Sequence, residues 1–455
     1  MKRYLVTLSI LAAGAAPGAL LRGQQIRGTV EKNAEKASIA IPDFRGSGEA
    51  QNFMNTFNAT LFSEVQNSGI FTMVPKTVMP LQIPQQPGDF KRPPKPGAKG
   101  NGYYLSDWSG PPANSTYLAF GYTAAQNGQI VLYGWLFNVQ QPDAATAQVL
   151  GKVYNATLDE AGAKNVAQQF AADILKQFGG VSLMGTKIYF VSDRSGHKEI
   201  WWMDYDGSNQ TQFTHYGSIS TFPCVSPDGT KLAFTSYLHG QPEIVVHSLV
   251  SGRKLPYYNQ HASMNAASDF TTDNQHLLIY STAAVGYSQV FQTNLDGGGL
   301  QRLTFANSIA VEPKMNPKTG ASMVFVSDRS GLPQIYTMSV DGVNVARLTD
   351  GEGEAVNPSW SPDGQHIAFA WTKGFAPGNY NIFVMDVATR DITQLTHEEG
   401  RNENPSWAPD GVHIVYSSRQ GRKTELWTML ANGTGKRQVT TVGNNEKPVW
   451  SRGSY

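Results

Sequence analysis

The sequence predicts an α+β N-terminal domain followed by an all-β domain, and three observations support this. The 455-residue chain is 40% hydrophobic and only 16% charged, against a typical charged share of about 25%, which indicates a globular chain and not a disordered one. It contains 45 Gly and 25 Pro, a turn-rich composition. One strand pattern recurs six times between 187 and 451, at intervals of 44 to 47 residues. Because a four-stranded propeller blade takes about 40–50 residues, we predict a six-bladed β-propeller closed by the C-terminal strand.

Residues 1–23 have the composition of a secretory signal peptide, with an approximate cleavage position. The segment opens with Lys2 and Arg3, continues with an apolar run, and supplies small residues around 14–19. The alternative is an uncleaved anchor, but Pro17 and the glycines leave the apolar run short of the ~20 residues that a membrane span needs. We therefore expect an exported protein that is soluble after cleavage.

Residues 38–180 predict a small α/β domain, with two helices on a sheet of three or four strands. Apolar residues spaced by three and four within 51–67, and again within 159–178, form one face of a helix in each segment. Short β-branched runs predict the strands, two of which are joined by a tight Asn-Gly hairpin turn at 127–128. The Pro-, Gly- and Lys-rich segment 79–113 predicts an exposed insertion or a flexible loop.

The segment 187–451 is predicted to hold the six blades. The first strands of the six copies begin at Lys187, Lys231, His276, Ser322, His366 and His413. Pro-Asp-Gly at 227–229, 362–364 and 409–411 predicts tight turns, because Pro fixes φ and Gly accepts a positive φ. The third and fourth copies replace this turn sequence by Thr-Thr-Asp-Asn and Asn-Pro-Lys-Thr-Gly.

The count of inner strands predicts how the ring closes. A Pro-x-Trp-Ser strand or its equivalent precedes each later copy, but none precedes the first copy at Lys187. The last inner strand, Pro448 to Ser451, has no copy after it. If that strand enters the first blade, two open sheet edges disappear. We therefore expect Trp450 to lie close to Tyr189.

An export signal, a small α/β domain and six such repeats, in that order, resemble the TolB family of the Tol–Pal envelope system. The resemblance includes the Asn-Ser-Gly-Ile-Phe junction at 67–71, the Asn-Gly hairpin, and Leu-Thr with Pro-Ser-Trp-Ser-Pro-Asp-Gly at 348–364. It covers essentially the whole chain after the signal. The departures are a longer Pro- and Lys-rich stretch at 82–102 and the two altered turns.

The resemblance implies a non-enzymatic periplasmic adaptor with no cofactor, no nucleic-acid partner and no membrane span. Members of the family bind the lipoprotein Pal on the propeller and the inner-membrane protein TolA through the mature N-terminus. They support outer-membrane integrity and its invagination during cell division, and the resemblance also allows other outer-membrane proteins as partners. The matching arm here is 24–37, with Ile26, Arg27 and Val30 as candidate contacts. Two interpretations of the arm stay open: it docks in a groove, or it is a frayed terminus.

The loops between the repeats are predicted to line one mouth of the propeller and to offer a polar surface to a protein partner. We place the candidate Pal-binding residues just before the inner-strand prolines or beside them. They are Met264, Ala267, Val311, Glu312, Glu354, Asn357, Arg401, Glu403 and Asn404. For any one of these residues, a solvated rim position is the simpler interpretation.

Other features exclude function classes. Lys and Arg number 36 against 35 Asp and Glu, so there is no basic excess to bind nucleic acid. The single cysteine, Cys224, cannot form an intrachain disulfide or a multi-cysteine metal site, and its apolar strand context predicts burial. The histidines show no metal-binding spacing. The sequence leaves open whether acidic residues near the channel hold a cation.

Two alternatives remain at this stage. Related propellers form a lid domain in peptidases, but that reading requires a Gly-x-Ser-x-Gly elbow, which the sequence does not contain. A glycan-binding propeller would require convergent carboxylates and aromatic rings in the channel. Both alternatives would still be exported propeller proteins.

Overall fold

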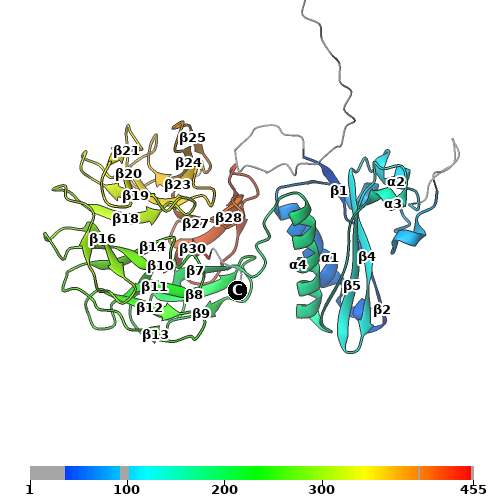
Figure 1. The fold of residues 1–455 in the computed structure, drawn as a ribbon, viewed down its shortest axis with the longest axis horizontal. Coiled ribbons are helices and arrows are strands. Elements are labelled where there is room, and N and C mark those ends of the chain that lie inside the picture. The colour runs from blue at the N-terminus through cyan, green and yellow to red at the C-terminus, as the bar shows by residue number, and fades with distance from the viewer. Residues whose placement is uncertain (1–35, 93–101, 398–399, 452–455) are drawn as a thin grey trace, which may run out of the picture.

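The computed structural model describes residues 36–92, 102–397 and 400–451, and these form two domains (Figure 1). A mixed α/β domain comes first, and a propeller follows it. Helices α1 and α4 of the first domain lie between its sheet and the propeller (Figure 1). The expected signal peptide at 1–23 lies outside the described residues.

The N-terminal domain contains a six-stranded sheet with the order β3-β1-β4-β5-β6, and β2 pairs with β4. The strands are β1 (Ser38–Ala40), β2 (Arg45–Ser47), β3 (Thr72–Met73), β4 (Tyr117–Gln126), β5 (Gln129–Asn138) and β6 (Gln148–Thr157). The helices are α1 (Met54–Asn67), α2 (Leu105–Ser109), α3 (Ala144–Ala147) and α4 (Glu160–Gln177), with 3-10 turns at Gly48–Phe53, Lys76–Val78 and Pro87–Asp89. The sheet has six strands where three or four were predicted, and β2 was missed because its sequence, Arg-Gly-Ser, has no apolar alternation.

Both faces of this sheet are covered over part of their length. Phe57 of α1 and Phe170 of α4 are fully buried against one face. On the other face, Phe120 and Phe137 of the sheet pack with Trp108 of α2. The two helices predicted from apolar spacing therefore form the first of the two cores.

The segment 79–113 is only partly the exposed insertion that its composition predicts. Leu81 is almost fully exposed, but Trp108 is fully buried and Leu105 and Ala113 are also buried. The indole N–H of Trp108 donates to the carbonyl of Gly102 at 2.9 Å. The expectation fails here because Pro and Gly abundance indicates turns, whereas a few apolar side chains decide whether turns pack on a core.

The propeller contains six four-stranded antiparallel sheets among the described residues. The β10–β13 blade is Ser220–Val225, Lys231–Ser236, Glu243–Ser248 and Lys254–Leu255; the β14–β17 blade is Asn265–Phe270, His276–Ser281, Gln289–Asn294 and Gln301–Arg302; the β18–β21 blade is Ala310–Met315, Ser322–Ser327, Gln334–Ser339 and Ala346–Arg347. The β22–β25 blade is Ala355–Trp360, His366–Trp371, Asn381–Asp386 and Ile392–Gln394; the β26–β29 blade is Arg401–Trp407, His413–Gln420, Lys423–Leu430 and Arg437–Gln438. In each blade the first strand named is innermost.

The sixth blade joins the two ends of the propeller, as predicted. It has the order β30-β7-β8-β9, with β30 at Asn445–Trp450, β7 at Lys187–Ser192, β8 at Glu199–Asp204 and β9 at Thr211–Gln212. Val449 lies opposite Tyr189, and Trp450 lies opposite Ile188. The indole N–H of Trp450 also donates to the hydroxyl of Thr186 at 2.9 Å. The C-terminal strand therefore closes the ring.

The altered turn of the β14–β17 blade keeps the geometry of the other turns. Asn274 has φ of 58°, in the place where Gly364 and Gly411 have φ of 69°. Asparagine tolerates this left-handed conformation better than most residues. The unusual sequence therefore changes the turn chemistry and not the strand register.

The N-terminal domain packs on the propeller face that carries the turns between inner and second strands. A cavity of about 830 Å³ lies between the domains, lined by α1, by the Asp410–His413 turn and by Tyr205 and Asp206 of the first blade. Beside it, the Lys164 ammonium of α4 lies 2.6 Å from the carboxylate of Asp206. The opposite face of the propeller, which carries the predicted rim, is left clear of the N-terminal domain.

A half-buried carboxylate joins the two domains at this interface. Glu64 of α1 accepts a hydrogen bond from the hydroxyl of Tyr205, and Gln168 of α4 donates to both side chains. Burial raises the pKa of Glu64 above its usual 4.5; the Asp206 charge adds to this rise, while the hydrogen bonds and Lys164 oppose it. The folded protein therefore binds this proton more tightly than the unfolded chain does.

This pKa predicts how the stability depends on pH. Glu64 stabilises the fold most below pH 4.5, and this contribution is lost as the pH rises through the raised, folded pKa. We expect Glu64→Gln to compare more favourably with wild type at pH 8 than at pH 4.5, as measured by urea unfolding. Glu160→Gln, an exposed site on α4, is the control. A stability difference for Glu64→Gln that is constant across pH would contradict the assignment.

Candidate functional site at the propeller channel

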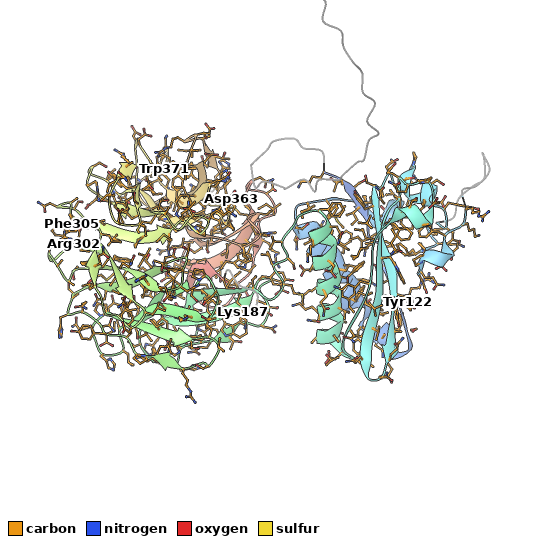
Figure 2. All side chains as sticks on the ribbon, in the orientation of Figure 1. Tyr122, Lys187, Arg302, Phe305, Asp363 and Trp371 are labelled. Atoms are coloured by element: carbon orange, nitrogen blue, oxygen red, sulfur yellow. The ribbon has the colours of Figure 1, made fainter. Side chains whose placement is uncertain are left out.

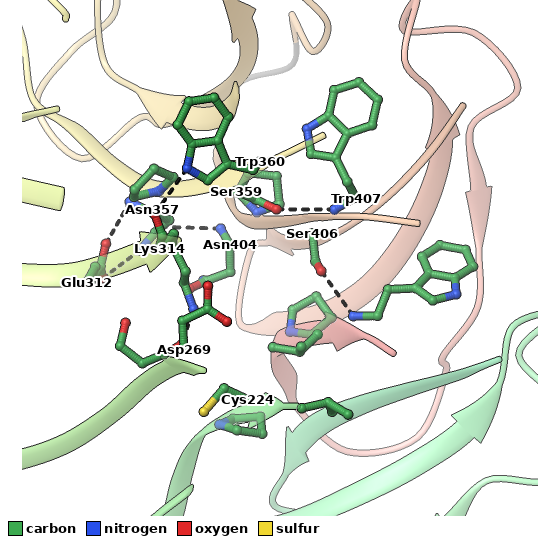
Figure 3. Close-up of a pocket in the computed structure, with 18 of the residues that line it drawn as sticks. Cys224, Asp269, Glu312, Lys314, Asn357, Ser359, Trp360, Asn404, Ser406 and Trp407 are labelled. Atoms are coloured by element: carbon green, nitrogen blue, oxygen red, sulfur yellow. Dashed lines mark hydrogen bonds between the residues drawn. The ribbon is translucent and has the colours of Figure 1, made fainter. Parts of the chain in front are cut away.

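The inner strands surround a channel of about 380 Å³ along the propeller axis (Figure 3). Its lining begins at the loop face with the residues that precede the inner-strand prolines. It continues toward the N-terminal domain to Trp360, Trp407 and Trp450. All six blades contribute residues, because the inner strand of each blade runs along the axis.

A repeated backbone feature shapes the channel mouth. In five blades the residue before the inner-strand proline has a positive φ of 52–54°, and a β-bulge shifts the register at that point. These residues are Phe222, Glu312, Asn357, Asn404 and Lys447. A bulge re-aims a side chain, and a non-glycine residue with positive φ stores strain that is concentrated at functional sites. The mouth is therefore formed by the same fixed backbone conformation in five blades, and not by free loop ends.

Three of these residues form a hydrogen-bonded chain from blade to blade (Figure 3). The carboxylate of Glu312 accepts the backbone N–H of Asn357 at 2.8 Å and its side-chain amide at 2.9 Å. The side-chain oxygen of Asn357 in turn accepts the backbone N–H of Asn404 at 3.3 Å. Each bulge therefore fixes the next one, and the spacing of neighbouring blades at the mouth is set by side chains.

The other half of the mouth is aromatic and cationic. The Lys447 ammonium lies 4.4 Å from the centre of the Phe222 ring, and that ring meets Tyr280 edge to face at 5.9 Å. Burial raises the pKa of Tyr280 well above its usual value, so its hydroxyl stays protonated at neutral pH. The mouth thus pairs an acidic and amide side with an aromatic and cationic side.

Deeper in the channel, the charged groups are held by the inner strands. The Lys314 ammonium donates to the carbonyl of Ser268, and the Asp269 carboxylate accepts the N–H of Met315 at 3.0 Å. Cys224 is buried, as predicted, and burial raises the pKa of its thiol to about 12. The thiol is therefore protonated and unreactive at neutral pH.

A second polar network lies on the rim outside the mouth. The guanidinium of Arg401 lies 2.7 Å from the carboxylate of Glu403 and 5.5 Å from the centre of the Tyr380 ring. The hydroxyl of Tyr380 donates to the carboxylate of Glu354. Three charges of the predicted set are therefore brought together by one tyrosine that the prediction did not include.

The predicted rim residues fall into three groups. Ala267, Glu312, Asn357 and Asn404 line the channel, and Glu354, Arg401 and Glu403 form the rim network. Met264 and Val311 lie at or next to their inner strands but belong to neither set. Ile26, Arg27 and Val30 of the arm lie outside the described residues.

Sequence analysis missed Phe222, Lys447 and Tyr380. Phe222 and Lys447 stand directly before Pro223 and Pro448, so the rule used for Asn357 would have found them. Tyr380 precedes β24 on a long loop, and no repeat position marks it. Only the fold brings its ring to the neighbouring blade.

The loop face also exposes several apolar side chains on the loops of other blades. Inter-blade loops and the loops between second and third strands emerge on the same face, because successive strands are antiparallel. They expose Ile219, Leu238, Val285, Phe305, Ile309, Leu332 and Val442. Figure 2 shows Phe305 and Arg302 at the propeller margin remote from the N-terminal domain. Exposed apolar side chains beside fixed polar groups are a feature of surfaces that dock another protein.

The described residues contain no group of three His, Cys, Asp or Glu side chains placed to hold a metal ion. Within the same ranges, no helix is long and apolar enough to cross a membrane. What the channel and rim present is a fixed arrangement of hydrogen-bonding groups, ion pairs and aromatic rings, and such an arrangement supports binding.

Fold and site together define a six-bladed β-propeller with an N-terminal α/β domain and a structured binding mouth. The sequence profile described as "TolB beta propeller domain" matches residues 175–454. The match covers more than half of the chain, so this protein belongs to the TolB β-propeller family. The predicted resemblance and the predicted fold class are both confirmed.

Individual relatives agree with this assignment. A "Protein TolB homolog" of Chlorobium chlorochromatii is 36% identical over 215 residues, which cover 47% of this chain and 46% of that protein. A "Tol-Pal system protein TolB" of Bordetella pertussis is 31% identical over 186 residues, covering 40% of this chain and 41% of its own. The chain spans about half the length of the first curated relatives it matches.

A solved structure shares the fold over nearly the whole molecule. TolB from Acinetobacter baumannii superposes with a TM-score of 0.73, covering 92% of this chain and 97% of that one, at 21% identity. The similarity therefore extends beyond the propeller to the two-domain arrangement.

Proposed function

We propose that this chain is a non-enzymatic periplasmic adaptor of a Tol–Pal system. In this role the propeller mouth binds the lipoprotein Pal, and the N-terminal arm, residues 24–37, binds TolA. The complex then supports outer-membrane integrity and invagination during cell division. The names of relatives from Bordetella species place those proteins in the Tol–Pal system, and membership of the family extends the proposal to this chain.

The observation that carries the proposal is the hydrogen-bonded mouth formed by Glu312, Asn357 and Asn404. Strained backbone at five equivalent positions is retained only where the surrounding structure fixes it, and such strain is associated with binding sites. The groups are pre-organised, so little side-chain entropy is lost when a partner binds. The apolar side chains on the loop face supply the hydrophobic part of a protein interface.

The position of the N-terminal domain is compatible with a partner at the mouth. It packs on the face opposite the mouth, so the loop face is left open to a partner protein.

Calorimetric titration of the exported chain, residues 24–455, tests the proposal. We expect soluble Pal, without its lipid anchor, to bind with micromolar affinity or tighter. We expect the periplasmic domain of TolA to bind the same chain and to lose its affinity when residues 24–36 are deleted. Absence of Pal binding would overturn the propeller role, and unchanged TolA affinity after the deletion would overturn the role of the arm.

A further inference from the structure

Among the edge strands of the described sheets, one is much longer than all the others. In the propeller the outer strands β9, β13, β17, β21, β25 and β29 are two or three residues long. In the N-terminal sheet, β3 has two residues and β2 has three. Short edges protect a protein from pairing with other chains. The remaining edge strand, β6, has ten residues.

β6 has one of the usual protective features, a β-bulge where its pairing with β5 shifts register between Leu136 and Phe137, but its pairing is regular from Leu150 to Thr157. The strand contains no proline, and seven of its ten residues are exposed. Its only charged residue is Lys152, and the ammonium of Lys152 lies 2.7 Å from Asp173 of α4. That ion pair draws the charge over the helix side of the sheet and away from the open edge. The elements that mainly contact β6 are β5 and α4.

The hairpin turn fixes which backbone groups of β6 point outward. In the two-residue Asn127-Gly128 turn, Gln126 and Gln129 form the closing, hydrogen-bonded pair of β4 and β5. Odd-numbered residues of β5 therefore bond to β4, and even-numbered residues bond to β6. Since Gly134 lies opposite Lys152, the even residues of β6 bond to β5. Gly151, Val153 and Asn155 consequently direct their N–H and C=O groups outward.

The side chains along this edge define the chemistry of a matching strand. On the face away from α4, Val153 is 55% exposed and lies opposite Tyr133, whose ring stacks on Tyr122 at 4.8 Å. Figure 2 places Tyr122 on the side of the domain away from the propeller. On the helix face, the edge carries the Lys152–Asp173 ion pair. An added strand would thus meet apolar groups on one face and an ion pair on the other.

We propose that the open edge of β6 binds an extended strand of a partner protein by β-sheet augmentation. The partner strand is amphipathic, with apolar residues on the side of Val153 and polar residues on the side of Lys152 and Asp173. Three outward-facing residues supply the backbone hydrogen bonds, and the exposed valine supplies apolar contact. This surface is separate from both the channel mouth and the arm.

The position of the propeller favours a thin strand over a second copy of the chain. Antiparallel pairing of two β6 edges about a two-fold axis keeps like faces on the same side. Because the propeller lies on the α1 and α4 side of the sheet (Figure 1), both propellers would have to share that side. A single extended segment can pair with β6 without bringing a second propeller to that side of the sheet.

Binding of a defined peptide tests the edge directly. The probe is a fluorescein-labelled peptide of ten alternating valine and threonine residues with a lysine at each end. Its binding to residues 24–455 is measured by fluorescence polarisation. Val153→Pro combined with Asn155→Pro removes two outward N–H groups without breaking a bond to β5. We expect this variant to bind about tenfold more weakly, since two hydrogen bonds are lost. Val153→Thr keeps the outward N–H group and loses only apolar contact, so it should weaken binding by less than the double-proline variant does.

A second arm of the experiment does not depend on how the proline variant folds. The same peptide carrying N-methyl groups on alternate residues cannot form the ladder and should not bind the wild-type chain. In wild type, the amides of Gly151, Val153 and Asn155 should exchange with solvent rapidly and become protected when the unmodified peptide is added.

Several results would overturn the proposal. Equal binding of the N-methylated peptide, or equal binding by the double-proline variant, would show that the edge is not the site. Slow amide exchange in the free chain that becomes rapid on deletion of residues 24–35 would assign the edge to the chain's own arm. A dimer in sedimentation that the two prolines abolish would assign it to a second copy.

Discussion

Replacing Trp450 by alanine is expected to lower the free energy of unfolding by about 3–5 kcal/mol, the range for large buried aromatic residues. The indole is 3% exposed and packs in a core with Ile188, Phe190 and Leu426. Truncation leaves a cavity between the first and last blades and leaves the hydroxyl of Thr186 without its indole donor. Urea unfolding followed by circular dichroism measures the loss.

The position of Trp450 makes its effect different from that of an ordinary core residue. Strand β30 pairs with β7, which lies at the opposite end of the propeller sequence. Loosening this pair opens the ring and exposes two strand edges. We therefore expect amide exchange in Ile188–Val191 to accelerate in Trp450→Ala, even where the remaining blades stay protected.

Trp360→Ala is the matched control for ring closure. Trp360 occupies the equivalent position in the β22–β25 blade, is 5% exposed, and donates its indole N–H to the carbonyl of Lys314 at 3.0 Å. Its loss should lower stability by a similar amount, because a similar cavity forms. It should not accelerate exchange in β7. Equal acceleration in both variants would mean that the closing strand has no special role.

The closure could be predicted because it follows from counting. Six second strands and six inner strands, offset by one along the chain, leave a single closed solution, and the structure confirms it through Val449 and Tyr189. The rule survives the altered turn at Asn274, since a turn residue affects only local φ. A repeated pattern therefore predicts long-range strand pairing, which no single segment predicts.

The details of the mouth could be predicted only in part. Glu312, Asn357 and Asn404, which stand before three of the inner-strand prolines, were predicted to lie at the propeller mouth, and they line the channel. The positive φ of Phe222 and Lys447 could not be predicted, because bulky residues rarely adopt that conformation and the bulge is imposed by the packing of neighbouring blades.

The interface between the domains was invisible to sequence reasoning. The pattern over 51–67 located the buried face of α1 through its apolar residues, and it carried no signal for Glu64. Its burial depends on where the propeller lies, and the hydroxyl of Tyr205 reaches it from 141 residues further along the chain. Composition likewise failed for Trp108, whose burial depends on the shape of the sheet beneath it.

Reversing three charges of the rim network should have the largest effect on partner binding. Glu354→Lys, Arg401→Glu and Glu403→Lys together invert a network in which Arg401 contacts both Glu403 and Tyr380. If Pal docks on this face, we expect its affinity to fall about 100-fold, equivalent to about 2.7 kcal/mol. Thermal stability should change little, because the ion pair is partly exposed.

A matched triple variant on the other face separates position from net charge. Arg253→Glu, Asp341→Lys and Asp391→Lys change the net charge by the same amount at exposed turns on the face opposite the mouth. Calorimetry should show Pal affinity within about twofold of wild type for this control, since charges far from an interface are screened by salt. If the rim variant bound Pal as tightly as the control does, Pal would have to dock elsewhere. The mouth would then bind another ligand, because backbone strain like that at Glu312, Asn357 and Asn404 is retained mainly at functional sites.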